Sequence, residues 1–209
     1  PSCWSPSEFS EVTSMREITL FVEDHAHYEF LNALIQRLAR EHSQIITLNW
    51  RNVRRGHNAV IHELKQFLRD LARGRGGYPD LVVVATDANC RGIAQRVKEI
   101  REVTDATAAR VICAVPDPHV ERWLLVDSAA FKAVLGRGCA APDQKCERAR
   151  YKRLLIEAIR QAGITPNLGG IEFAADIVAA MDLGQASRLD PSLQRFLDEM
   201  NGVFREWRS

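Results

Sequence analysis

The 209-residue sequence has no apolar run close to the roughly 18 residues that a membrane-spanning helix needs. It also lacks the patterns GxxxxGK[ST] and GxGxxG, which excludes the plain nucleotide-hydrolase and dinucleotide-binding classes. Internal repeats and low-complexity segments are absent too. Its 46% apolar and 26% charged residues are ordinary for a globular protein. We therefore expect a soluble globular chain, with no membrane contact and with the cytoplasm as its default location.

Cysteine is scarce and its spacing shows no pairing. The five cysteines, at positions 3, 90, 113, 139 and 146, form no CxxC motif and are odd in number. This pattern argues against a disulfide framework and against structural zinc, so we expect reduced thiols. Residues 1–15 contain no basic segment followed by an apolar one, and we interpret them as a loose leader rather than a secretory signal.

A net charge of +1 conceals local basic clusters. The clusters are RNVRRGH at 51–57, RGRGG at 73–77 and KCERARYKR at 145–153. Such clusters could face phosphate groups, which makes Arg54 and Arg55 candidate nucleic-acid contacts. The alternative is that they are solvated loops and helix faces.

Hydrophobic periodicity predicts four consecutive β-α units in the first two-thirds of the chain. Predicted strands at 17–23, 44–50, 80–86 and 109–116 are each followed by a predicted helix, at 27–42, 57–74, 92–103 and 118–127. Nearly continuous apolar strands are typical of a sheet buried on both faces. The fold class is therefore α/β, with a mostly parallel four-stranded sheet covered by helices on both faces.

The pattern changes after about residue 128. Helices are predicted at 147–163, 171–183 and 192–207, without a convincing strand between them. We interpret 16–128 as the α/β domain and 129–209 as a helical extension that packs on the same core.

Three of the four predicted strands end in acidic residues. Because ligands of open parallel sheets bind outside the carboxyl ends of the strands, we expect these side chains to converge at one edge. The residues concerned are Glu23, Asp24, Asp87, Asn89, Asp117 and Glu121. Hard oxygen donors with little sulfur or imidazole suit Mg²⁺ or Mn²⁺, the usual partners of phosphate chemistry.

An alternative exists for every one of these residues. Asp and Asn are preferred helix N-caps, and a β-α junction is where an N-cap belongs. The spacing of Asp87 and Asn89 favours a ligand role, because an extended chain would put both side chains on the same side.

The segments TLFVEDHAHYEFLNAL, LVVVATDANCRG and VICAVPDPHVERWLL together resemble the TOPRIM fold of topoisomerases, primases and OLD-family nucleases. The likeness is greatest to small stand-alone TOPRIM proteins of bacterial anti-phage and mobile-element systems, and it covers residues 16–128. It implies that Glu23 acts as general acid or base and that Asp87 begins the metal-binding Asp-x-Asp. It also maps Glu121 and Trp123 onto a Glu that precedes a Trp-Leu-Leu helix.

Two positions depart from that family pattern. Asp24 stands where a Gly is usual, which adds a ligand and removes a flexible turn. Asn89 replaces the second Asp, so it compensates less of the charge of a metal. We expect weaker metal binding unless Asp24, Asp117 or Glu121 compensates.

Several further residues are candidates for phosphate binding or proton transfer. His25 and His27 follow the first acidic strand end, and His119 follows the last one. Arg91, directly after Asn89 and Cys90, could present a cation to phosphate. Ordinary helix-start and turn positions are the alternative for all four.

The leading prediction is a Mg²⁺-dependent nuclease of the TOPRIM type that cuts DNA or RNA. Glu23, His27 and His119 would be catalytic, and Glu23, Asp87, Asn89, Asp117 and Glu121 would hold the metal. The resemblance also implies a separate ABC/SMC-type ATPase partner, because this chain has no Walker motif, and it leaves a homo-oligomer open. Two other functions stay open: a TOPRIM-shaped binding or regulatory subunit, and a phosphohydrolase acting on a small phosphoester.

Overall fold

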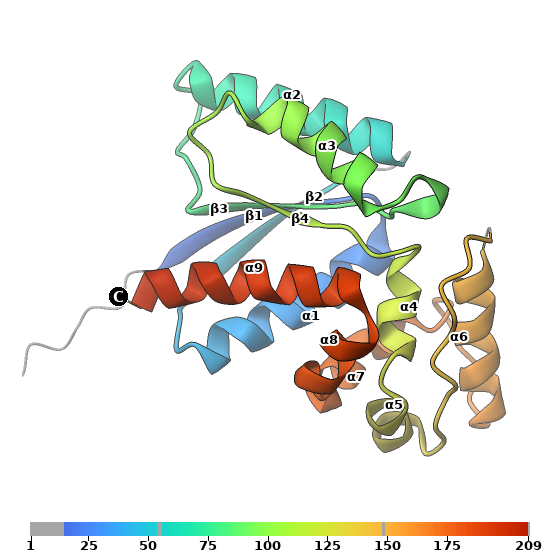
Figure 1. Cartoon of the computed structure of the whole chain (residues 1–209). Helices are drawn as coiled ribbons and strands as arrows, with labels where there is room; N and C mark the ends of the chain where they lie inside the picture. The colour runs from blue at the N-terminus through green and yellow to red at the C-terminus, as the bar shows by residue number, and fades with distance from the viewer. Residues whose placement is uncertain (1–14, 54–55, 148, 209) are drawn as a thin grey trace, which may run out of the picture.

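The structure is a computed structural model that describes residues 15–53, 56–147 and 149–208. Its strands are β1 (Arg16–Val22), β2 (Ile46–Asn52), β3 (Leu81–Ala85) and β4 (Val111–Ala114). They form one parallel sheet in the order β2-β1-β3-β4 (Figure 1). The prediction of a parallel α/β fold is confirmed.

The two central strands are buried on both faces, which is why their sequences read as continuous apolar runs. Every residue of β3, in the sequence LVVVA, has no exposed surface, and the last five residues of β1 are buried as well. Strand β2 lies at the edge and is more exposed: Trp50 keeps 41% of its surface in solvent.

Alternate residues of the strands serve two separate cores. On one face, Phe21, Val82 and Val84 pack against the helices α2 (His57–Ala72) and α3 (Ile93–Thr104). On the other face, Leu20 and Val83 join a larger cluster that contains α1 (His25–Glu41) and α9 (Pro191–Arg208). Figure 1 shows these helix pairs on opposite sides of the sheet.

The chain after β4 is helical and is divided into more helices than predicted, most of them shorter. It forms α4 (Val120–Leu125), α5 (Ser128–Leu135), α6 (Arg150–Gln161), α7 (Ala174–Ala180) and α8 (Leu183–Leu189) before α9. Short 3₁₀ turns lie at η1 (Asn89–Arg91) and η2 (Ile171–Phe173). The expected helix at 118–127 ends early because Asp127 caps α5 instead, accepting hydrogen bonds from the amides of Ala129 and Ala130. Buried residues of this region belong to the same cluster as α1.

The prediction of reduced thiols is wrong for one pair of cysteines. Cys90, in η1, is joined by a disulfide to Cys146, which lies before α6. Their 56-residue separation hides the pairing from motif analysis, since only the fold brings the two segments together. Cys113 and Cys139 are free, and burial raises the pKa of each thiol to about 11.

Within residues 15–53, 56–147 and 149–208, every helix is too short or too polar to cross a bilayer.

Candidate functional site at the carboxyl edge of the sheet

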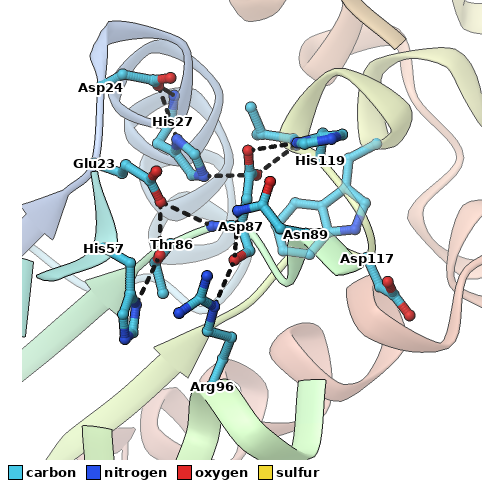
Figure 2. Close-up of polar contacts among 12 residues, drawn as sticks. Glu23, Asp24, His27, His57, Thr86, Asp87, Asn89, Arg96, Asp117 and His119 are labelled. Carbon is cyan, nitrogen blue, oxygen red and sulfur yellow. Dashed lines mark hydrogen bonds and ion pairs between the residues drawn. The ribbon is translucent and has the colours of Figure 1, made fainter. Parts of the chain in front are cut away.

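The site begins where β1 and β3 end side by side. Val22 and Ala85 are register partners in these parallel strands, so the residues that follow them emerge at the same edge. Glu23 then accepts hydrogen bonds on Oε2 from the amide of Asp87, at 3.2 Å, and from the hydroxyl of Thr86, at 2.6 Å. Glu23 and Asp87 therefore lie together at this edge, joined through the main-chain amide of Asp87 (Figure 2).

Acidic and imidazole groups alternate in a row across this edge, formed by Asp24, His27, Asp87 and His119. Asp24 Oδ1 lies 2.8 Å from His27 Nδ1, and His27 Nε2 lies 3.0 Å from Asp87 Oδ1. The contact between His27 Nε2 and Asp87 is close enough for an ion pair but does not have the geometry of a hydrogen bond. Asp87 Oδ2 lies 2.8 Å from His119 Nδ1. We call these four residues the Asp-His row; Figure 2 shows all of them.

The middle of the Asp-His row is a buried ion pair. Burial acts to lower the pKa of His27, but Asp87 and Asp24 outweigh it and hold the pKa well above 6.5. Burial likewise acts to raise the pKa of Asp87, and the two imidazoles outweigh it and lower that pKa. His27 has no exposed surface and lies between two carboxylates, an arrangement that favours its protonated form.

The outer members of the row differ from its middle. Burial acts to raise the pKa of Asp24, but the hydrogen bond from His27 contributes to lowering it to about 2. The hydrogen bond to Asp87 raises the pKa of His119. With Nδ1 held by Asp87, the Nε2 atom of His119 is the one left for other partners.

Asp24 and Asp87 both serve as helix caps, which is the alternative considered for these residues. Asp24 caps α1 by accepting a hydrogen bond from the amide of His27, at 3.0 Å. Asp87 Oδ1 accepts one from the amide of Val120, the first residue of α4, also at 3.0 Å. The carboxylate of Asp87 therefore already has three partners, one backbone and two imidazole.

A second polar chain starts at Glu23, and sequence analysis missed its members. The hydroxyl of Thr86 lies 3.1 Å from His57 Nδ1, and His57 Nε2 lies 2.7 Å from Glu99 Oε2. Thr86 has one hydroxyl proton, so when it donates that proton to Glu23 it accepts one from His57. Thr86 could have been predicted as a site residue, because it lies directly before Asp87 at the end of the strand. Nothing in the sequence pattern indicated His57 or Glu99.

The extended backbone assumed for Asp87 and Asn89 is not present. The chain leaves the extended conformation at once: Ala88 is helical, and Asn89 has a φ of +50° at the start of η1. The Asn89 side chain donates to the carbonyl of Asp87 at 3.4 Å. Arg96 donates to that same carbonyl at 3.2 Å, so the turn is held by its own polar contacts.

Other predicted site residues lie apart from the Asp-His row. Asp117 points away from Asp87 in Figure 2, and burial raises its pKa. Arg91 lies 3.6 Å from Glu99. His25 is half exposed and pairs with Glu29 at 3.2 Å. Arg54 and Arg55 lie outside the described residues.

Glu121 belongs to the acidic surroundings of the row. Burial raises the pKa of Glu121, and the nearby charge of Asp87 raises it further. Its side chain lines a cavity of about 250 Å³ together with Asp24, His25 and Lys152.

We tested whether these donors form a divalent-metal site. In the part of the chain that the structure describes, no three His, Cys, Asp or Glu side chains gather where they could hold an ion. Both oxygens of Asp87 face imidazole or amide groups, and Asp117 points elsewhere. As arranged, the residues do not fit a bound Mg²⁺, because His27 supplies positive charge beside the carboxylates of Asp24 and Asp87.

One comparison with known proteins gives a match. A family model described as a domain of unknown function, DUF4276, matches residues 22–201, which include the whole Asp-His row. No curated protein and no solved structure matches the sequence.

Proposed function

We propose that this chain, which belongs to the DUF4276 family, is a nuclease that hydrolyses phosphodiester bonds at the carboxyl edge of its sheet. The observation that carries the proposal is the Asp-His row, which ends at His119. A carboxylate that binds one ring nitrogen fixes the orientation of an imidazole and stabilises its protonated form, which equips the other nitrogen for proton transfer. Such an arrangement at the ligand-binding edge of an open α/β sheet supports a catalytic role.

The side chains divide the reaction between them. A water molecule attacks phosphorus and gives its proton to Glu23, whose Oε1 is clear of the two hydrogen bonds made by Oε2. The bond from phosphorus to the leaving oxygen breaks, and His119 Nε2 donates its proton to that oxygen. Asp87 orients His119, and the buried His27 holds Asp87 in place.

Three parts of the sequence-based hypothesis remain predictions: bound Mg²⁺ or Mn²⁺, a nucleic-acid substrate and an ATPase partner. The resemblance to TOPRIM proteins supports them. In the part of the chain that the structure describes, no donor set at this edge fits such an ion, so no step of the reaction is assigned to it.

Cleavage assays with matched variants test the proposal. Purified protein is incubated with end-labelled DNA and structured RNA, once with EDTA and once with Mg²⁺ or Mn²⁺. We expect His119→Ala to lose about 10²- to 10⁴-fold in rate, the usual contribution of a general acid. His62→Ala is the control, because His62 is exposed on α2, away from the edge. Equal rates for both variants, or no cleavage in any condition with the candidate ATPase added, would refute the nuclease.

A binding or regulatory subunit is the second candidate function. It is favoured by one observation: each oxygen of Asp87 already has a partner within the protein. Glu23→Gln separates the two candidates, because it abolishes the cleavage of a nuclease and leaves the partner affinity of a scaffold unchanged.

A further inference from the structure

Strand β2 forms an open edge of the sheet. Edge strands in native proteins are usually short, or carry Lys, Pro or a bulge, because unpaired main-chain groups invite pairing with another chain. The opposite edge strand, β4, follows this rule with four residues. Strand β2 has seven residues, ITLNWRN, without Lys or Pro, and it pairs with β1 in an unbroken register from Ile46 to Asn52. Such an edge is open to a further strand.

The main-chain groups of alternate β2 residues point out of this edge. The amide of Arg16 donates to the carbonyl of Ile45, and the amide of Val53 donates to the carbonyl of Val22. Because the direction of these groups alternates along a strand, the odd-numbered residues of β2 face β1 and the even-numbered ones face away from it. Within the described residues, no hydrogen bond reaches the main chain of the even-numbered ones. They are Ile46, Leu48, Trp50 and Asn52.

We propose that a second copy of β2 pairs with this edge in the antiparallel direction, so that the chain forms a two-fold symmetric dimer. With Asn49 opposite its own copy on the two-fold axis, every outward-facing residue lies opposite an outward-facing residue of the second copy. Leu48 lies opposite Trp50, and Ile46 lies opposite Asn52. Each of these pairs exchanges two hydrogen bonds. Centring the pair on Leu48 or Trp50 instead leaves one of the four without a partner in β2.

The side chains on the α1 face agree with this register. Trp50 stacks on Tyr28 of α1 and keeps 41% of its surface exposed. In the dimer this exposed part contacts Leu48 of the second copy, which removes apolar surface of both from water. The contact occurs twice, because the two-fold axis repeats it.

The charges on the α2 face agree as well. Arg51 is the charged residue of β2, and it lies opposite Thr47 of the second copy, so like charges do not meet. Glu17, one strand further, is the register partner of Thr47 and carries the opposite charge to Arg51. Arg51 pairs with Glu63 of its own copy, but 48% of its side chain stays exposed toward other groups. The strand therefore complements itself in charge and offers no such match to a copy in the parallel direction.

Cysteine cross-linking tests the register. Asn49 faces its copy in a non-hydrogen-bonded position, where the Cα atoms lie about 4.5 Å apart, a distance that a disulfide spans. We expect Asn49→Cys to give a covalent dimer on a non-reducing gel after mild oxidation. Thr47→Cys is the matched control, because the two new thiols would lie four residues apart, about 13 Å along the strands. Both variants also carry Cys3→Ser, so that this native cysteine does not react.

Analytical ultracentrifugation over a range of concentrations measures the dimer directly. Asn49→Lys places two ammonium groups face to face on the two-fold axis, so we expect the dissociation constant to increase at least about tenfold. The substituted side chain still has a donor for Glu17, to which Asn49 donates at 2.9 Å, so the fold is kept. Gln95→Lys is the control, because it makes the same change of charge on an exposed position of α3, which contacts β4 at the other edge.

The outcomes decide which strand, if any, occupies the edge. A dimer that cross-links at position 49 and not at 47, and that Asn49→Lys dissociates, supports the proposal. A dimer that Asn49→Lys leaves intact uses another surface and refutes it. If the whole chain is a monomer and only a chain shortened to residues 15–209 dimerises, residues 1–14 occupy the edge and the proposal fails. A monomer in both forms leaves the edge to a different protein and overturns the proposal too.

These outcomes are independent of the proposed nuclease function. In the antiparallel dimer the carboxyl edges of the two sheets point in opposite directions, and each Asp-His row lies within one copy. We therefore expect Asn49→Lys to change the dissociation constant and to leave cleavage per chain unchanged. Loss of cleavage in His119→Ala with an unchanged dimer would support both inferences separately.

Discussion

His27→Gln is the sharpest test of the buried charge at the sheet edge. The substitution removes an imidazolium that lies between Asp24 and Asp87 and keeps a polar side chain. Breaking a buried ion pair costs about 3–5 kcal/mol. Asp87 keeps two other donors, so we expect the lower end, about 3 kcal/mol in the free energy of unfolding. For a chain of this length that corresponds to a fall of roughly 6–12 °C in Tm.

The loss has a pH dependence whose sign follows from the raised pKa of His27. Folding raises this pKa above 6.5, so the stabilisation is fully present below pH 6.5 and is lost as the pH rises through the folded-state value. In that interval the folded state holds one more proton, and the free energy of unfolding falls by about 1.4 kcal/mol per pH unit. His27→Gln removes this slope.

The acid side has the opposite sign. The pKa values of Asp24 and Asp87 are lowered by folding, so their contribution is present above pH 3.8 and is lost as the pH falls through the folded-state values. Together the pairs stabilise the fold most between pH 3.8 and 6.5.

Urea denaturation at several pH values measures the effect in the wild type and in His27→Gln. The matched control is His25→Gln, since His25 lies on the same turn, is half exposed and makes its ion pair at the surface, with Glu29. The control should change stability by less than about 1 kcal/mol. If the difference between the wild type and His27→Gln is the same at pH 6 and pH 9, the charge has no part in the loss and the reasoning fails.

Three further predictions concern packing and the disulfide. Gly170→Ala should lower the free energy of unfolding by about 1–3 kcal/mol, because Gly170 has a φ of +95° and a Cβ would lie 2.3 Å from Ile159 Cδ1. Gly202→Ala should raise it by about 0.5–1 kcal/mol, because Gly202 lies in α9 with open space around it. Equal shifts in Tm for the two variants would contradict this reasoning. Ser192→Ala should cost about 1–3 kcal/mol in urea denaturation, because the buried indole of Trp123 loses its acceptor; an unchanged midpoint would show that the bond is dispensable. Without reductant, Cys146→Ser should lower the free energy of unfolding by about 2–4 kcal/mol, because the disulfide to Cys90 is lost. With reductant, the variant and the wild type should be equally stable. A difference that persists in reductant would exclude the disulfide as the cause.

Much of the fold could be predicted because burial on both faces leaves a direct trace in the sequence. The run LVVVA of β3 is apolar at every position, and helices such as α1 repeat their apolar residues at helical spacing. The short helices α5 and α8, of eight and seven residues, were missed because they span about two turns and show no extended period.

The site was predictable at the level of which residues share an edge, and not at the level of which atoms meet. Parallel strand ends brought Glu23 and Asp87 together as expected. The chain at Asn89 is not extended as expected, because the φ of Asn89 is +50°. Asn tolerates this left-handed conformation, and residue spacing alone does not reveal it. His57 joined through Thr86 from a distant helix start, a contact that depends on how α2 packs.

The arrangement at the edge also follows from electrostatics. Four carboxyl groups lie at the ends of two strands and the start of α4, and like charges that are close together repel each other; they belong to Glu23, Asp24, Asp87 and Glu121. Such a cluster folds only if cations or protons compensate it. His27 supplies one buried cation, His119 carries a second when protonated, and the raised pKa of Glu121 makes its carboxyl group easier to protonate. A divalent ion would have to compete with these imidazoles for Asp87, so the affinity for a metal should increase in His27→Gln. Calorimetry with Mn²⁺ measures this affinity in the wild type and in the variant. Weaker binding in the variant would show that His27 supports a metal instead.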